Sequence, residues 1–161
     1  MKHLKRPLAI LFVLAFNLTQ AAEQSANKIE FNMPEKFTDF SSNENRNAKD
    51  REKLMGQLSD LMTKSISKNS KDTFEITVND IDMMGRFILT NTDFVRVVKE
   101  FDRTRFEFSY KMIDSEGKVV KQGDVNLTDR NPLNLKNQSN KYKSTYFSNE
   151  MRLFDDWLKA L

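Results

Sequence analysis

The sequence predicts a single α+β domain, in which a small, mainly antiparallel sheet of three to five strands carries two helices on one face. Residues 104–128 alternate apolar and polar side chains around a glycine-containing turn, which is typical of a β-hairpin. Residues 45–67 and 148–161 repeat apolar side chains every three or four positions, which is typical of amphipathic helices. Because a two-stranded ribbon is marginal in water, the central hairpin needs the helices as a cover.

The first part of the domain is predicted to hold a strand and the longer helix. Ile29, Phe31 and Met33 alternate with polar residues, and Pro34 ends this strand because proline donates no ladder hydrogen bond. The helix over 45–67 follows. Its apolar stripe is formed by Leu54, Leu58, Leu61, Met62 and Ile66.

The polar face of this helix mixes both signs of charge, whereas helices that lie on membranes are mainly basic there. We therefore interpret it as a packing helix. Gly56 lies inside it, where glycine costs about 1 kcal/mol relative to alanine. The alternative is that Gly56 marks a close contact with the sheet.

A second strand is predicted at Phe74, Ile76 and Val78, which alternate with polar residues. Residues 86–93 fit no regular pattern and are expected to leave the sheet. Residues 94–98 are expected to return as a short edge strand.

The central hairpin has one aromatic face, formed by Phe106, Phe108, Tyr110 and Met112. Gly117 supplies the turn, where a positive φ is needed. The return strand places Val119, Val125 and Leu127 on one side, although Lys121 and Gly123 share their parity. A bulge near Lys121–Gly123 would explain the interruption.

Residues 129–146 are predicted to form a loop rich in Asn, Lys and Ser, and a loop this long in a small domain is usually functional or disordered. Aromatic and amide side chains suit adaptable recognition. The candidate partner contacts are Asn131, Tyr142, Tyr146 and Phe147. The alternative is a solvated loop without a binding role.

The start of the chain predicts export. Lys2, Lys5 and Arg6 precede an apolar run that is far shorter than the roughly 20 residues of a membrane-spanning helix. Small residues then favour cleavage near Ala21. We expect a signal peptide over 1–21, a flexible leader over 22–27 and one domain over 28–161. The mature chain is expected to have no transmembrane segment and to reside in the periplasm.

Composition excludes several functions for such a mature chain. The net charge of +3 comes from the three basic residues of the signal peptide, so nothing favours nucleic acid as a partner. The chain has no cysteine, and its only histidine is His3. Ser-His-Asp and Cys-His catalysis, and zinc sites built on His or Cys, are therefore excluded, and we expect no cofactor.

Four stretches together carry a family resemblance: FNMPEKFTD, DIDMMG, RVVKEFDRTRFEFSYKM and FSNEMRLFDDW. In these stretches the chain resembles the bacterial family called domain of unknown function 3016. The most specific part includes Glu150, Asp155, Asp156 and Trp157 on the last helix, which we interpret as a structural motif. The resemblance implies export by a Gram-negative bacterium and carries over no catalytic residue.

Two carboxylate pairs could bear chemistry. Asp80 and Asp82 lie two apart at a strand end, where Asn79 could add a third oxygen to a calcium site, although such residues are also common turn formers. Asp155 and Asp156 are neighbours on one helix, whereas glycoside hydrolysis needs carboxylates on opposite sides of a cleft. Asp155 is instead expected to bond an arginine or a backbone amide. The candidate arginine partners of Asp155 are Arg103, Arg105 and Arg130.

Three functions remain open from the sequence. The first is a non-catalytic interaction or accessory module of the cell envelope, with a periplasmic or envelope protein as partner. The second is a carboxylate-dependent hydrolase of an envelope glycan. The third is a protein that binds a small apolar ligand between helix and sheet.

Overall fold

The computed structural model describes residues 26–42, 47–83, 85–91, 94–97, 99, 102–129 and 145–161. Its centre is a four-stranded sheet with the strand order β1-β2-β5-β6. These strands are β1 (Lys28–Phe31), β2 (Thr73–Asp82), β5 (Thr104–Ile113) and β6 (Val119–Asp129). The pair β1–β2 is parallel, and the pairs β2–β5 and β5–β6 are antiparallel.

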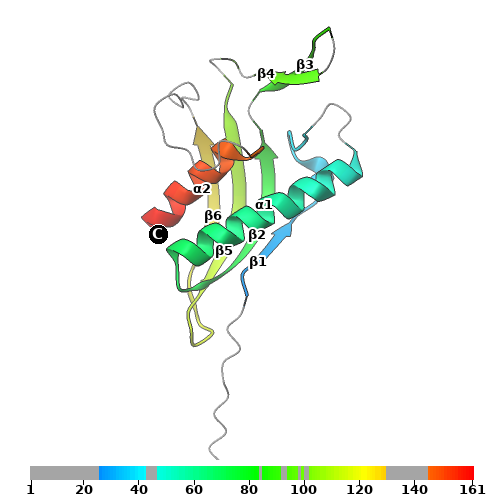
Figure 1. Ribbon diagram of the computed structural model, residues 1–161. Helices are drawn as coiled ribbons and strands as arrows, with labels where there is room; N and C mark the ends of the chain where they lie inside the picture. Colours follow the sequence, from blue (N-terminus) through cyan, green and yellow to red (C-terminus); the bar gives the residue numbers. More distant parts are fainter. Residues whose placement is uncertain are drawn as a thin grey trace, which may run out of the picture.

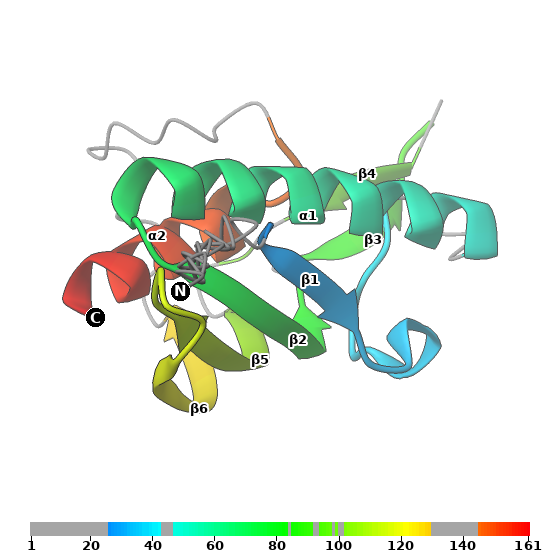
Figure 2. The same cartoon turned by 90° about the horizontal axis from the view of Figure 1, so that it is seen from below.

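Two helices, α1 (Ala48–Asn69) and α2 (Ser148–Ala160), lie side by side on the same face of this sheet, so the domain has two layers (Figures 1 and 2). The predicted α+β class, the mainly antiparallel sheet and the central hairpin are therefore confirmed. No helix in the described residues is both long enough and apolar enough to span a membrane.

The core lies between the two layers and is mainly aromatic. Phe106 and Phe108 of β5 are fully buried, and Trp157 of α2 packs edge-on against Phe108 with ring centroids 4.8 Å apart. Phe154 completes this contact at 5.7 Å from Phe108. Each fully buried side chain of this size contributes roughly 1.5–3 kcal/mol. The helices thus provide the cover that the hairpin needs.

The longer helix starts at Asn47, whose side chain accepts a hydrogen bond from the backbone N–H of Asp50 at 2.8 Å. Its predicted apolar stripe faces the sheet, except that Leu61 is only partly buried. The helix runs two residues beyond the predicted end, because Ser70 still donates its backbone N–H to Ile66 at 2.8 Å.

Met33 and Val119 do not lie where simple alternation placed them. The first strand ends at Phe31, and Met33 is 48% exposed with a left-handed φ of 52°. In β6, Lys121 pairs with Met112 whereas Val119 pairs with Ile113, so Val120 is the extra residue of the bulge. The bulge therefore moves Val119 to the uncovered face and leaves Lys121 on the same face as Val125.

Gly123 is explained by its cross-strand partner instead of by a bulge. It pairs with Tyr110, and a β-carbon at Gly123 would lie 3.6 Å from the Tyr110 ring. The aromatic ring thus covers the place where a side chain is missing.

A second, two-stranded sheet is formed by β3 (Arg86–Leu89) and β4 (Phe94–Val97), which pair antiparallel. The sequence predicted an edge strand over 94–98, but β4 pairs with β3 and not with the main sheet. We call this pair the β3–β4 hairpin. It projects beyond the end of the main sheet that is opposite to the β5–β6 turn (Figure 1).

Replacing Gly56 with alanine should stabilise the protein by up to about 1 kcal/mol, because Gly56 is exposed and a β-carbon there would meet nothing within 4 Å. Urea denaturation of both proteins measures this difference. Gly117→Ala is the matched control and should destabilise, since Gly117 has a φ of +81°. A loss of stability in Gly56→Ala would restore the alternative of a close contact with the sheet.

Candidate functional site

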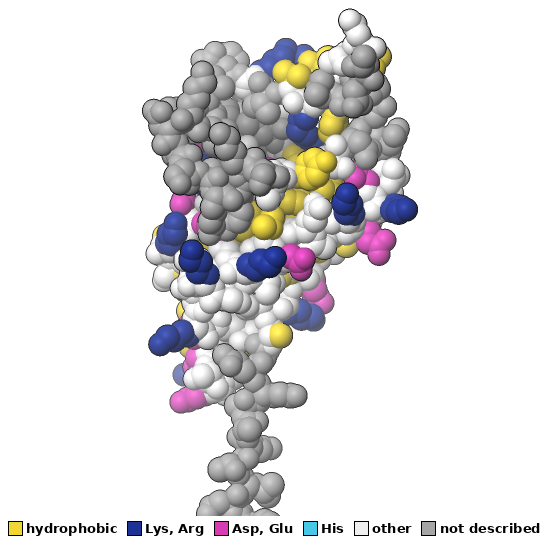
Figure 3. All heavy atoms as spheres, viewed as in Figure 1, with side chains coloured by type: hydrophobic (Ala, Val, Ile, Leu, Met, Phe, Trp, Pro, Cys, Tyr) yellow, Lys and Arg dark blue, Asp and Glu magenta, His cyan; other side chains and the backbone are white. Residues whose placement is uncertain are grey.

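The β3–β4 hairpin exposes two consecutive apolar side chains. Ile88 is 36% exposed and Leu89 is 65% exposed. Because neighbouring residues of a strand point to opposite faces, each face of the ribbon presents one of them. Figure 3 shows exposed apolar side chains at this end of the molecule. Single exposed apolar residues are common on protein surfaces, so these two are of interest because they lie on an element that projects from the domain (Figure 1).

Arg96 of β4 fastens this hairpin to the domain. Its guanidinium donates to the Asp39 carboxylate at 2.9 Å and to the Ser41 carbonyl at 2.8 Å. It also reaches the carbonyls of Met83 and Gly85, each at 3.3 Å, at the point where the chain leaves β2. The planar, multi-donor guanidinium suits such a junction. We call these contacts the Arg96 clamp.

A cation–π contact adds to the clamp on the hairpin side. The Arg96 guanidinium carbon lies 4.5 Å from the centroid of the Phe87 ring, and the two residues are cross-strand partners. The Arg96 side chain is only 18% exposed. The hairpin is thus held at its base while Leu89 lies free near its turn.

Asp39, the anionic partner in the clamp, is itself fixed against the end of β2. Its backbone N–H donates to Ile81 at 2.9 Å, and its carbonyl accepts from the Met83 N–H at 3.0 Å. These two bonds form a parallel bridge between Asp39 and Asp82. The clamp is therefore built on the backbone of the main sheet.

Asp80 and Asp82 share the uncovered face of the sheet, because a bulge at Asn79 shifts the register of β2 against β5. Asp80 accepts hydrogen bonds from the Thr38 N–H and hydroxyl, each at 2.7 Å, and from Arg105 at 2.6 Å. Partial burial opposes ionisation, but these donors lower the pKa of Asp80 below its ordinary value. Asp80 therefore works as an anionic brace.

The calcium hypothesis gains no support from this geometry. Burial raises the pKa of Asp82 above its ordinary value, against the opposing effect of Arg105. The Asn79 side chain, predicted as a third ligand, donates to the Ser109 hydroxyl at 2.8 Å. Within the described parts of the chain, no three His, Cys, Asp or Glu residues are grouped in a way that could hold a metal ion.

Glu150, in the first turn of α2, is 2% exposed, and its carboxyl group contacts the Thr104 hydroxyl. Burial raises its pKa above the ordinary value, against the opposing effects of the Thr104 hydrogen bond and its own backbone N–H. The helix dipole also favours an anion here, but typically by only 0.3–1 kcal/mol, whereas burying a charge costs several.

Of the other residues of the predicted structural motif, Asp155 and Trp157 hold α2 in place. Asp155 is buried and accepts from the Ser65 hydroxyl of α1. The sequence predicted an arginine or a backbone amide as the Asp155 partner, and Arg105 instead pairs with Asp80. Asp156 is exposed and lies 3.5 Å from Arg152. Trp157 packs in the aromatic core.

The predicted partner contacts in the loop have different outcomes. Asn131 and Tyr142 lie outside the described residues. Tyr146 is 54% exposed, so its side chain is accessible. The prediction for Phe147 is wrong, because this side chain is fully buried and packs against Phe40 with ring centroids 5.9 Å apart.

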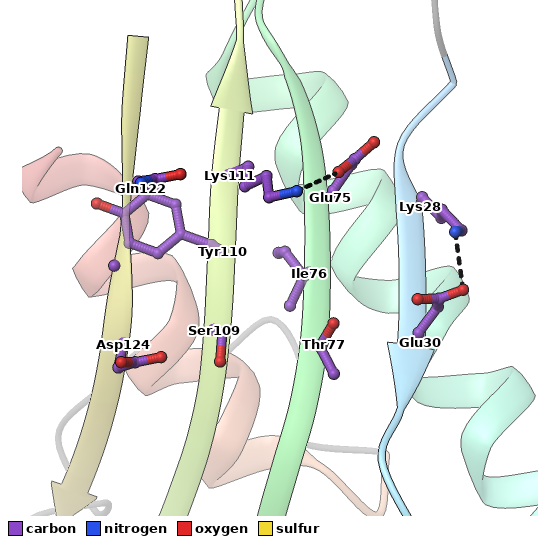
Figure 4. Close-up of a pocket in the computed structure, with 11 residues that line it drawn as sticks. Lys28, Glu30, Glu75, Ile76, Thr77, Ser109, Tyr110, Lys111, Gln122 and Asp124 are labelled. Atoms are coloured by element: carbon purple, nitrogen blue, oxygen red, sulfur yellow. Dashed lines mark ion pairs between the residues drawn. The ribbon is translucent and has the colours of Figure 1, made fainter. Parts of the chain in front are cut away.

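The uncovered face of the main sheet carries a shallow polar hollow of about 560 Å³ (Figure 4). Short side chains, Thr77 and Ser109, lie at its centre, and longer charged ones surround them. Two ion pairs border it: Lys28–Glu30 at 2.8 Å and Lys111–Glu75 at 3.6 Å. Because both signs of charge alternate, the hollow favours no charged ligand and is typical of a solvated sheet face.

A smaller hollow of about 390 Å³ lies where α1 and α2 end. Phe74, Met112 and Leu158 supply apolar side chains to its wall, and Lys159 and Asn69 supply polar ones. Of the described hollows, this one matches best the position expected for a small apolar ligand between helix and sheet.

The Arg96 clamp and the contact between Glu150 and Thr104 were missed in the sequence. A cation between Val95 and Val97, inside an otherwise apolar strand, was the available signal for the clamp. No signal indicated the partner of Glu150, because Thr104 is 46 residues away in the chain.

A family model described as "Protein of unknown function (DUF3016)" matches residues 25–160. No curated protein and no solved structure matches the chain.

Arg96→Lys should loosen the β3–β4 hairpin while leaving the main sheet intact, because lysine keeps the charge but loses the planar fork. Losing hydrogen bonds of about 1 kcal/mol each should raise amide exchange in β3 and β4 tenfold or more. Hydrogen exchange read by mass spectrometry measures this effect. Arg103→Lys, at an exposed position beside β5, is the control. Unchanged hairpin exchange in Arg96→Lys would contradict the clamp.

Proposed function

Since the chain belongs to the family described as "Protein of unknown function (DUF3016)", its role has to come from its own residues, and we propose that it is an exported, non-catalytic interaction module of the cell envelope. Its contact surface in this proposal is the β3–β4 hairpin. The observation that carries the proposal is the exposure of Ile88 and Leu89 on an element that the Arg96 clamp holds at its base.

Two carboxylates that could have been catalytic, those of Asp80 and Asp155, support a non-catalytic role, because each has a structural task. Asp80 joins the segment after β1 to β5 through Thr38 and Arg105. Asp155 joins the two helices. Glycoside hydrolysis would need two carboxylates on opposite sides of a cleft, whereas these two groups brace separate junctions.

The export part of the proposal is supported by the N-terminal sequence. Lys2, Lys5 and Arg6 precede the apolar run Leu8–Phe16, and small residues follow it. The family match starts after this region, at residue 25. A Gram-negative periplasm is the compartment in which such a protein would meet envelope partners.

Expression with a C-terminal tag in a Gram-negative cell should give a protein in the periplasmic fraction that begins near residue 22. Osmotic-shock fractionation and N-terminal mass spectrometry measure this. A variant with Glu in place of Lys2, Lys5 and Arg6 should leave the precursor uncleaved, since the basic region directs insertion. A wild-type protein found in the cytoplasm with its first residues intact would refute export.

A photo-crosslinking amino acid placed at position 89 of the exported protein should capture a discrete partner protein in cells, because Leu89 is the most exposed large apolar residue described. The control places the same amino acid at position 120, since Val120 is 49% exposed at the opposite end of the sheet. Mass spectrometry of the products identifies the partner.

Variants then assign the contact surface. The double change Ile88→Ser and Leu89→Ser should abolish recovery of this partner together with the tagged protein. Removal of residues 134–145 should leave recovery of the partner unchanged. Loss of the partner only in the loop deletion would move the contact to the predicted loop. Equal capture at positions 89 and 120, or none at either, would contradict the hairpin as the interaction surface. Turnover of an envelope glycan by the purified protein would instead favour the hydrolase.

A further inference from the structure

Glu150 takes part in a short hydrogen-bond chain that is one proton short unless its carboxyl group is protonated. The Thr104 oxygen contacts two groups: the Asp82 carbonyl at 3.1 Å and the Glu150 carboxyl. A hydroxyl has one proton to donate, and a carbonyl oxygen can only accept. When Thr104 donates to Asp82, the Glu150 carboxyl has to supply the proton of the other bond.

The surroundings of Glu150 favour the neutral carboxyl. The side chain is 2% exposed, and its second oxygen is buried without a hydrogen-bond partner among the described residues. A charge there would face Arg96 of β4 and Asp39 of the segment after β1. These two groups already pair with each other at 2.9 Å, so the nearest cation is occupied by another anion.

We propose that the β3–β4 hairpin is held firmly at its base while the Glu150 carboxyl group is protonated, and that loss of this proton at higher pH loosens the hairpin. We call this device the proton latch. The connection runs through short contacts. Thr104 bonds both Glu150 and the Asp82 carbonyl, and the backbone of Asp39 bonds the residues on either side of Asp82. The Asp39 carboxylate holds Arg96, which fastens the hairpin.

Ionised Glu150 would act on the clamp through Thr104. An ionised carboxyl group takes the Thr104 hydroxyl proton, which removes the bond to the Asp82 carbonyl, and the backbone of Asp39 is bonded to the residues on either side of Asp82. That the hairpin binds a partner rests on the proposed function, whereas the latch itself does not. If both hold, partner binding depends on pH through this one buried group.

The sign of the effect follows from linkage. Burial raises the pKa of Glu150 above its ordinary value of 4.5. The stability that protonated Glu150 contributes is therefore fully present below its pKa in the unfolded chain, and it is lost as pH rises through its pKa in the folded protein. In that range the unfolding equilibrium constant should rise about tenfold per pH unit from this group alone.

The test compares wild type with Glu150→Gln, which keeps a neutral donor at this position at every pH. Urea denaturation at half-unit steps from pH 4 to 9 should show the tenfold-per-unit rise in wild type relative to the variant. Amide exchange in β3 and β4 should become faster in wild type than in Glu150→Gln as pH rises, while the centre of β2 and β5 stays protected in both. Asp156→Asn, an exposed carboxyl change on the same helix, should behave as wild type.

Parallel pH dependence of unfolding in wild type and Glu150→Gln would show that Glu150 is ionised in the fold, and would overturn the latch. A difference in unfolding without one in hairpin exchange would overturn its connection to the hairpin. If Glu150→Gln does not fold, the ¹³C carboxyl shift of Glu150 in wild type decides, since titration at or below 4.5 refutes the latch. Crosslinking from position 89 at low and high pH tests the proposed function separately, because failure to capture a partner at any pH leaves the latch measurements valid.

Discussion

The structure depends on the burial of one aromatic sheet face under two helices. Phe106 and Phe108 of β5 have no other place to avoid water, and Phe154 and Trp157 of α2 match them at ring-centroid distances of 4.8–6.3 Å. The chain has no cysteine, so no disulfide can replace this packing. The position of α2 then fixes where its polar residues fall, including the buried Glu150 and Asp155.

Polar contacts mark the places where this aromatic core ends. Ser65 and Asp155 join α1 to α2, and Arg152 of α2 pairs with Asp129 at the end of β6. At the end of the sheet beside the hairpin, Arg96, Asp39 and the Glu150–Thr104 contact occupy a space that apolar side chains do not fill. Buried polar groups stabilise only when they are satisfied, and most of these are. The second oxygen of Glu150 and the Nε of Arg152 are exceptions among the described residues, and the proton latch addresses the first.

The two faces of the sheet have different consequences for function. The covered face is filled by side chains, and the uncovered face presents alternating charges and hydroxyls that suit water. The β3–β4 hairpin belongs to neither layer, and those of its apolar side chains that the structure describes, on Phe87, Ile88, Leu89 and Val97, lie outside the buried core. An element with exposed apolar residues and a firmly bonded base is better suited to recognition than to stabilising its own fold.

The sequence alone determined the elements whose pattern is local. Alternation on β5 and the apolar stripes of α1 and α2 predicted the fold class, because one buried face imposes a period of 2.0 on a strand and 3.6 on a helix. The local pattern did not predict the face of a residue where the pairing of strands decides it. The bulges at Asn79 and Val120 reverse the faces of the residues beyond them, and they exist only through the register with β5.

The candidate sites needed the tertiary structure for the same reason. The sequence placed the contact surface in residues 129–146, where amide and aromatic residues are dense, but Phe147 is used by the core. Residues 86–93 fit no regular pattern, so the sequence did not single out Ile88 and Leu89, and their exposure is seen only because β3 pairs with β4 and not with the main sheet. Arg96 meets Asp39 across 57 residues, and Glu150 meets Thr104 across 46. Composition determined which catalytic groups this chain lacks, whereas burial and long-range pairing decided which of its carboxyl groups are braces and which one is buried with a raised pKa.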